Sequence, residues 1–288
     1  MAKNSIDEVR QSAALRRLFR SFLLAVLVYG VAVLYFFPIL YMFLSGFKTE
    51  AQAVNPHIFF KPTFSTYQKV LGDPTMHQYL KNSLFQVCFG TILCLALGIP
   101  AAFAIVFGRF NKKETPGKFY VWFITTILLP PVAVLIPLFT WYQKFNLINT
   151  PWGLLAVYVG THIPIVVWMV HSFFSDIPKE IFEAAEIDGC TKFQQMLRIA
   201  VPLARTGIIS AGLLVAVFIW NEFFLGFNLT GNPTATLPVY MARFREQQGQ
   251  FVAQLSAAST ISVLPAVIFG WLTQKALVKG LVAGAVKG

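Results

Sequence analysis

The sequence predicts an all-α polytopic membrane protein with six transmembrane helices. Three observations predict this fold class: 56% of the 288 residues are hydrophobic, only 12% are charged, and the apolar residues fall in long blocks without charge. A soluble domain carries roughly a quarter charged residues, so this chain has too few charges to cover a surface that faces water. A soluble enzyme is therefore a poor fit to the composition.

Six uncharged blocks define the expected spans, and most of them exceed the roughly 20 residues that a spanning helix needs. The block that ends at Asn221 is the shortest. It reaches that length only if the span includes the charged residue Glu222 near its end. Prolines interrupt five of the blocks; this favours kinked helices around a passageway, although proline is also common in membrane helices in general. The expected spans are Ser21 to Phe47, Asn82 to Gly108, Phe119 to Gln143, Phe145 to Ser175, Thr206 to Asn221 and Gln247 to Gln274.

The basic residues predict the orientation of these spans. Sixteen of the 23 Lys and Arg residues lie in the two tails and in the second and fourth loops, which all share one side of the membrane. Membrane proteins concentrate Lys and Arg on the cytoplasmic side, so both termini are expected there. The net charge of +11 then reflects topology, and no nucleic-acid partner is expected. The expected organisation is a cytoplasmic tail (1–20), a membrane domain (21–274) that includes the cytoplasmic loop 176–205, and a second cytoplasmic tail (275–288).

The loop 176–205 differs from the other cytoplasmic loops because its acids outnumber its bases. Its pattern predicts an amphipathic helix that ends at Gly189, followed by a second short helix that opens with the capping box Thr191 to Gln194 and stops near Pro202. Such a helix pair could lie on lipid, but interfacial helices are usually rich in Lys and Arg on their polar face. The acids therefore favour a protein partner with a basic surface. The acids are Asp176, Glu180, Glu183, Glu186 and Asp188.

This loop resembles the EAA loop of permease subunits in ATP-binding-cassette (ABC) importers. Cys190 and Val201 depart mildly from the family pattern, in which alanine and leucine are common. The resemblance implies that the loop is a coupling helix, which sits in a groove of a cytoplasmic ATPase subunit. The matching residues, and so the expected ATPase-coupling residues, are Glu183, Ala184, Ala185, Asp188, Gly189, Ile199 and Pro202.

Further segments are similar to one branch of that family, the second permease subunit of maltose-type carbohydrate transporters. They are the stretch from Trp220 to Phe224, the segment from Thr236 to Val239 and the ending from Val282 to Gly288. The resemblance implies the type I importer permease fold and a tail that contacts the ATPase through Lys287 and Gly288. The tail is rich in glycine, which suits a flexible segment better than an independent fold.

The family resemblance also implies a mechanism and a set of partners. A permease of this kind works by alternating access in a bacterial inner membrane, together with a second homologous permease, a dimer of cytoplasmic ATPase subunits and an extracytoplasmic solute-binding protein. ATP and magnesium are expected in the partner ATPase, because this chain lacks a phosphate-cradling Gly-x4-Gly-Lys-Ser/Thr loop. No cofactor or metal is expected in this chain, and its four histidines and three cysteines form no recognisable catalytic constellation.

The possible substrate path is expected at Asn221 and Glu222. Glu222 is the one acid within a predicted span, about 25 Å beyond Arg205 along a helix, and a buried acid usually faces a cavity or a partner. Its carboxylate could equally lie in the outer headgroup region, and His162 and His171 are expected to be packed. The solute stays open among a disaccharide, a polyol, a glycerol-linked sugar and glycerol phosphate. A secondary transporter is the alternative, but it should show paired charges or inverted repeats near the midplane, and none is evident.

Overall fold

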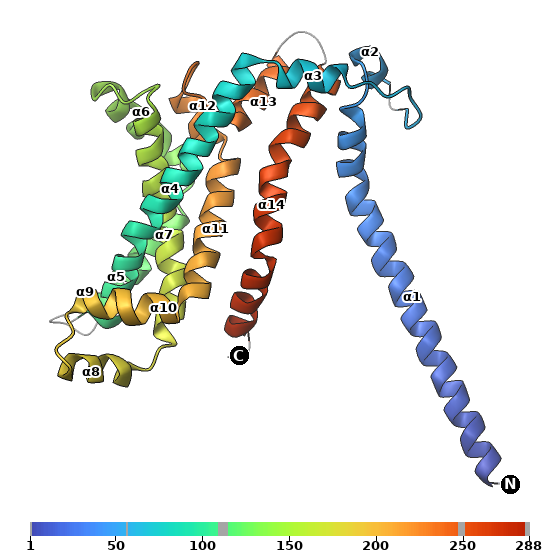
Figure 1. Ribbon diagram of the computed structural model, residues 1–288, viewed down its shortest axis with the longest axis horizontal. Helices are drawn as coiled ribbons and strands as arrows, with labels where there is room; N and C mark the ends of the chain where they lie inside the picture. Colours follow the sequence, from blue (N-terminus) through green and yellow to red (C-terminus); the bar gives the residue numbers. More distant parts are fainter. Residues whose placement is uncertain (1, 56, 109–114, 247–250, 286–288) are drawn as a thin grey trace. The chain divides into compact units, whose positions relative to one another are not determined.

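The computed structural model describes residues 2–55, 57–108, 115–246 and 251–285, with side chains for all of these except 2–18, 245–246, 269 and 272–285. Within these ranges the chain forms helices and no strand, so the all-α prediction is confirmed. The residues group into two compact units, Met1–Val70 with Gln250–Thr260, and Leu71–Gly249 with Ile261–Gly288. Figure 1 labels the helices.

The first unit is organised around a buried lysine. It contains α1 (Ala2–Ser45), α2 (Glu50–Ala53) and most of α3 (Ser65–Leu71). The Nζ of Lys48 donates to the carbonyl oxygen of His57 at 2.6 Å and to the hydroxyl of Tyr41 at 3.3 Å, and its side chain is 1% exposed. These bonds tie the first loop back onto the end of α1.

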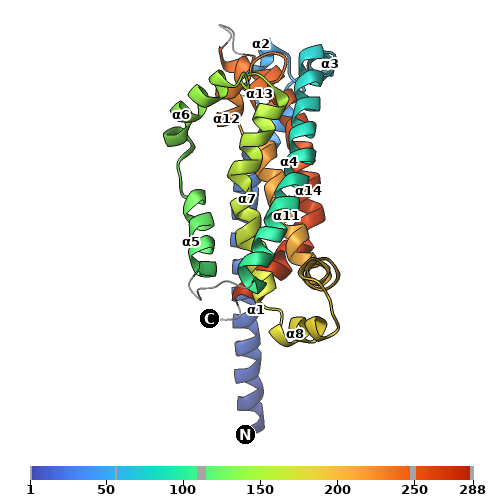
Figure 2. The same ribbon diagram turned by 90° about the vertical axis from the view of Figure 1, so that its left-hand side faces the viewer.

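The second unit is built on three packed helices, α4 (Pro74–Phe107), α7 (Pro151–Ser175) and α11 (Arg205–Asn221), which run side by side in Figures 1 and 2. Glycines permit the close approach: a Cβ on Gly98 would lie 2.6 Å from Val166, and one on Gly207 would lie 2.2 Å from the ring of Phe173. Small residues at helix contacts are typical of membrane bundles, where packing rather than water expulsion drives association.

At one end of the bundle, polar side chains of α4 hold the segment that leads into α13 (Leu237–Glu246). The Nδ2 of Asn82 donates to the carbonyl oxygens of Pro233 and Ala235, and the Tyr240 hydroxyl donates to Asp73 at 2.7 Å. Burial disfavours the charged form of Asp73, but hydrogen bonds from Tyr240 and from nearby amides outweigh burial and lower the pKa of this carboxyl.

The third expected span is broken, which corrects the prediction of one helix from Phe119 to Gln143. Instead, Figure 2 shows two separate helices, α5 (Thr115–Ile127) and α6 (Pro131–Lys144). The angle between them is 92°. Pro130 and Pro131 lie at the break, where the missing N–H groups and the fixed φ of proline prevent a continuous helix. The fourth span also starts later than expected, at Pro151, because the Thr150 side chain caps the start of α7.

The other prolines do not break their helices. Pro38 in α1, Pro100 in α4, Pro164 in α7 and Pro265 in α14 (Val252–Ala285) all lie inside continuous helices. Among the described residues, three helices are long and apolar enough to cross a membrane, or up to five if each bent pair counts as one span. A shorter apolar stretch, Val252–Ile268, lies within the sixth expected span, Gln247 to Gln274.

The two expected tails largely continue these helices, since α1 begins at Ala2 and α14 extends to Ala285. The backbone structure therefore does not change at residues 20 and 274. These two boundaries stay a prediction of where the chain enters and leaves the membrane.

Candidate functional site

The loop 176–205 folds into two short helices at the end of the bundle, where Figure 1 shows α8, α9 and α10 together. The first, α8 (Lys179–Ile187), follows Pro178 and ends as the sequence predicts. Gly189 has φ +80°, in the left-handed region that favours glycine, and the amide of Cys190 donates to the Ala185 carbonyl at 2.9 Å. This bond closes the helix end in a Schellman-type turn.

The second helix is composite. The capping box of Thr191 and Gln194 is confirmed, and it opens α9 (Lys192–Gln195). A π-helical turn, Met196–Ala200, follows and leads into α10 (Val201–Leu203). The chain then bends by 83° into α11, so residues 192–203 lie across the end of the bundle rather than along it.

Most of the residues expected to act in segment 179–203 lie on its outer surface. Ala185 is buried against the bundle at 7% exposure, and Ile199 is half-buried. Exposed apolar side chains accompany them, most strongly Ile187 at 88% and Phe193 at 66%. An exposed surface that mixes apolar groups with acids is typical of a protein contact. The exposed members of the expected set are Glu183, Ala184, Asp188, Gly189 and Pro202.

The inner face of α8 is attached to the bundle by an aromatic cluster. Phe182 is 4% exposed, and its ring centroid lies 4.0 Å from that of Phe107 and 6.1 Å from that of Phe103, both at the end of α4. Phe174 of α7 completes the cluster, 6.1 Å from Phe103. A displacement of α8 would therefore act directly on α4 and α7, because packed aromatic groups compress little.

A buried amide joins α8 to α9. The Nε2 of Gln195 donates to the carbonyl oxygens of Phe182 and Cys190, both at 3.4 Å, and its Oε1 accepts from the Nζ of Lys192 at 3.2 Å. Lys192 also forms an ion pair with Glu186. Sequence reasoning missed Gln195 and the aromatic partners of Phe182. The available signal was the pair Phe103 and Phe107, four residues apart near the end of α4.

The other expected site lies at the far end of α11, where the helix stops at Asn221. Glu222 has extended backbone angles, and its two carboxylate oxygens accept from the amides of Leu225 and Gly226 at 2.8 and 3.0 Å. The carboxylate thus caps the next short helix, α12 (Phe224–Leu229). Asn221 is exposed, and its Nδ2 donates to the Val217 carbonyl at 2.8 Å.

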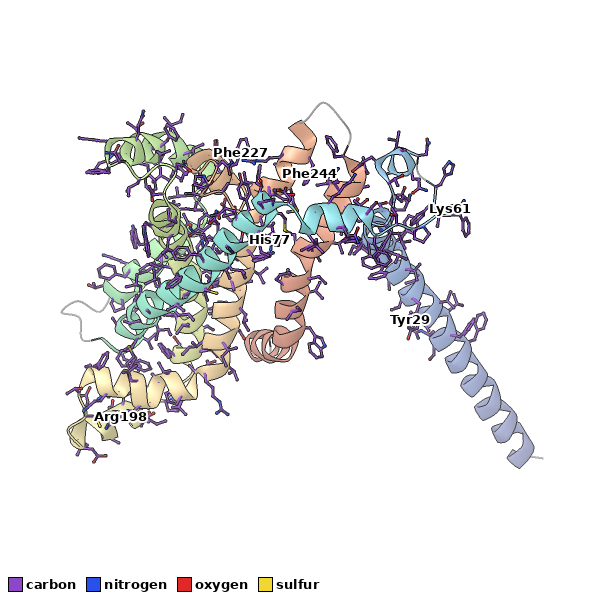
Figure 3. All side chains as sticks on the ribbon, turned by 45° about the horizontal axis from the view of Figure 1, so that its top comes forward. Tyr29, Lys61, His77, Arg198, Phe227 and Phe244 are labelled. Carbon is purple, nitrogen blue, oxygen red and sulfur yellow. The ribbon has the colours of Figure 1, made fainter. Side chains whose placement is uncertain are left out.

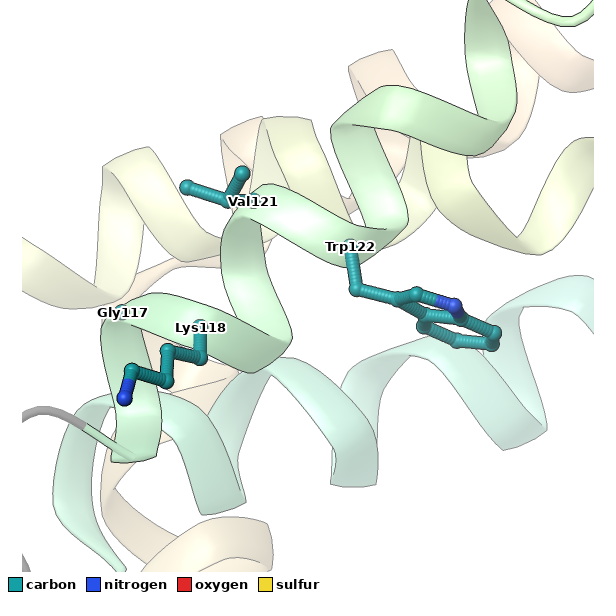
Figure 4. Close-up of a pocket in the computed structure, with 4 residues that line it drawn as sticks. All are labelled: Gly117, Lys118, Val121 and Trp122. Carbon is teal, nitrogen blue, oxygen red and sulfur yellow. The ribbon is translucent and has the colours of Figure 1, made fainter.

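Other chemical groups of the described part of the chain do not form a site. His162 is 8% exposed and bonds the Tyr158 carbonyl through Nδ1, and His171 stacks on Tyr120 with centroids 3.9 Å apart, so both are packed as expected. A shallow hollow beside Lys118 and Trp122 is lined by residues of α5 alone (Figure 4). No group of three or more metal-ligating side chains occurs among the described residues. Lys287 and Gly288 lie outside those residues.

Comparisons with known proteins agree on one family. Residues 94–282 match the model of the family described as binding-protein-dependent transport system inner membrane component. The chain is 33% identical over 259 residues to the sulfoquinovosyl glycerol transport system permease protein SmoH of Agrobacterium fabrum, covering 88% of this chain and 89% of that protein. It is 32% identical over 265 residues to the trehalose/maltose transport system permease protein MalG of Thermococcus litoralis, covering 90% and 94%.

A solved structure shares the fold. The chain aligns with the crystal structure of a bacterial ABC transporter involved in the import of the acidic polysaccharide alginate, with a TM-score of 0.73 and 23% identity, covering 90% of this chain and 96% of that chain. This likeness supports the type I importer permease architecture that the sequence predicts.

Proposed function

The chain belongs to the binding-protein-dependent transport system inner membrane components, the permease subunits of ABC importers, and we propose that it conducts a sugar or sugar-like solute by alternating access. The relatives named for sulfoquinovosyl glycerol and for trehalose and maltose support a sugar as the solute class. A permease subunit is not itself catalytic, so the energy comes from a partner. We assign the ATP and magnesium to a dimer of cytoplasmic ATPase subunits.

The remaining partners and the topology are part of the same proposal. A second homologous permease would complete the transport path, and a solute-binding protein would deliver the sugar from outside. The excess of Lys and Arg in the two tails and in the second and fourth loops supports a cytoplasmic location of both termini in a bacterial inner membrane. The acidic, apolar outer surface of segment 179–203 would then face the ATPase, and Lys287 and Gly288 would reach the same partner.

One observation supports this mechanism: segment 179–203 is exposed on one face and packed through Phe182 into the aromatic cluster of α4 and α7 on the other. A force applied to the outer face would reach the bundle through the Phe182 ring. Gly189 and the hydrogen bonds of Gln195 would keep the two short helices together while this force acts. We therefore expect Glu183, Ala184, Asp188 and Gly189 to contact the ATPase or to shape that contact.

The coupling role is tested by substituting Gly189 in the complete transporter, reconstituted in vesicles with its binding protein. Gly189→Val forces a β-branched residue to positive φ, so we expect ATP hydrolysis to continue while sugar import falls by about tenfold or more. Gly189→Asn is the matched control, because asparagine tolerates this backbone conformation, and it should retain coupling. Normal import by a well-expressed Gly189→Val variant would refute the coupling role.

The solute class is tested by uptake of a panel of sugars, polyols and glycerol phosphate in cells that lack this subunit. Loss of uptake confined to sugars supports the proposal. Uptake that is lost only for glycerol phosphate would identify a non-sugar importer. Uptake that persists without the partner ATPase would instead indicate a secondary transporter.

A further inference from the structure

The outer end of the fifth span presents two aromatic rings, one just before and one within a short, separately capped helix. In α12, Leu225 and Leu229 are buried at 3% and 2% exposure, whereas Phe227 on the opposite side is 45% exposed. Phe223, just before α12, is 40% exposed, and its ring centroid lies 5.3 Å from that of Phe227 at an interplanar angle of 31°. Figure 3 labels Phe227 on this helix. The two rings form one aromatic surface.

Two carboxamides are close to these rings in sequence, Asn221 just before Phe223 and Asn228 directly after Phe227. The Nδ2 of Asn221 donates to the Val217 carbonyl at 2.8 Å, and the Nδ2 of Asn228 donates to the Phe224 carbonyl at 2.7 Å. Each amide is thereby oriented along its own helix, and neither carboxamide oxygen has a hydrogen-bond partner among the residues that the structure describes. Polar groups that face hydrocarbon without a partner are costly, so these two carboxamides are poorly suited to contact lipid tails.

The helix that carries Phe227 and Asn228, α12, is held firmly in place. The carboxylate of Glu222 accepts from the amides of Leu225 and Gly226, and the Tyr158 hydroxyl of α7 donates to the Glu222 carbonyl at 3.4 Å. The Thr230 hydroxyl donates to the Gly226 carbonyl at 2.5 Å. Glu222 is thus a structural cap, and the groups left to meet a ligand are the rings and the amides.

We propose that Phe223 and Phe227, with Asn221 and Asn228, form an external entry subsite that binds a pyranose ring. One face of a pyranose exposes C–H bonds, whose weakly positive hydrogens pack on the negative face of an aromatic ring, while its hydroxyls bond to amides. An acyclic polyol or glycerol phosphate offers no such ring face. The proposal rests on the proposed function, and it narrows the solute to a cyclic sugar received at the outer end of the path.

The test measures sugar affinity of the permease itself. The complete transporter is assembled with an ATPase variant that binds ATP without hydrolysing it, and the solute-binding protein is left out. The Kd for a radiolabelled cognate sugar is then measured by equilibrium dialysis. Phe227→Ala should raise this Kd by about three- to tenfold, as expected for loss of one aromatic contact. Phe227→Tyr keeps the ring and should restore the affinity.

Phe89→Ala is the matched control, because Phe89 has a similar exposure, 47%, but belongs to α4 and to none of the segments that form the subsite. An unchanged Kd in Phe227→Ala, or an equal rise in Phe89→Ala, would overturn the subsite. The subsite would also be overturned if a sorbitol-like polyol bound the wild-type transporter as tightly as the cyclic sugar does. If the wild-type transporter imports sugar yet shows no affinity without its binding protein, the subsite fails and the proposed function stands. Absence of sugar import by wild-type cells would refute the proposed function itself.

Discussion

Short helices lie at both ends of α11, and they are held in place by different interactions. At Ala204 the chain turns by 83°, and the helices beyond the turn are held by buried aromatic rings of three separate helices. At Glu222 the helix stops, and the short helix beyond it is held by a carboxylate that accepts two amide hydrogen bonds. The end at Ala204 is therefore held by packing between residues far apart in sequence. The end at Glu222 is held by a largely local cap.

This difference matches what each end is proposed to do. Packing through Phe182 connects segment 179–203 to α4 and α7, so a displacement there spreads through the bundle. A cap at Glu222 orders a helix of six residues and leaves its aromatic face free. The comparison suggests that force enters the molecule at the packed end and that ligand meets the capped end.

The largest expected effect comes from breaking the packed end. Phe182→Ala would remove a ring that is 4% exposed and leave a cavity among Phe103, Phe107 and Phe174, at a cost of about 3–5 kcal/mol. We expect a clear fall in the apparent Tm of the purified transporter and a larger fall in sugar import than in ATP hydrolysis. Phe36→Ala is the control, since that ring is 58% exposed and its loss should leave Tm unchanged. If Phe182→Ala and Phe36→Ala imported the same amount of sugar per ATP hydrolysed, the proposed connection between α8 and the bundle would be contradicted.

A smaller effect is expected at the capped end. Glu222→Ala would leave the amides of Leu225 and Gly226 without their acceptors, at a cost of about 0.5–2 kcal/mol. Hydrogen exchange of these two amides should increase, while that of α8 stays unchanged because the cap is local. Glu222→Gln keeps one acceptor oxygen and should lie between wild type and alanine. Faster exchange in α8 would show that the two ends are not independent.

The smallest effect concerns the polar contacts that hold the segment before α13. Hydrogen bonds from Tyr240 and nearby amides outweigh burial and lower the pKa of Asp73 from its usual range, so the folded state favours its carboxylate form. This contribution to stability is present above the unfolded-state pKa and is lost as the pH falls through the folded-state value. Apparent Tm should therefore be unaffected by Asp73 between pH 7 and pH 5 and should fall below about pH 4. Tyr240→Phe removes the hydrogen bond at 2.7 Å and should reduce this acid-dependent part of the fall.

The local features of segment 179–203 could be predicted because they depend on neighbours in sequence. The turn at Gly189 and the capping box of Thr191 and Gln194 are set by backbone chemistry within a few residues. The break at Pro130 and Pro131 was predicted only as a kink, since the bend angle depends on what the two halves pack against. The role of Glu222 as a cap was also missed, because an acid in an apolar block indicates a polar environment without identifying its partner.

The sequence by itself determined the all-α membrane class, the family and the order of its elements, because composition, charge and short motifs act along the chain. Only the tertiary structure decided that Phe182 meets Phe107, that Gln195 joins two helices, and that Phe223 and Phe227 share one exposed surface. Phe182 and Phe107 lie far apart in sequence, and hydrophobic patterning indicates which face is buried but not its partner. The physical reason is that burial is non-directional, whereas ring packing and hydrogen bonds require a specific geometry that only the folded chain supplies.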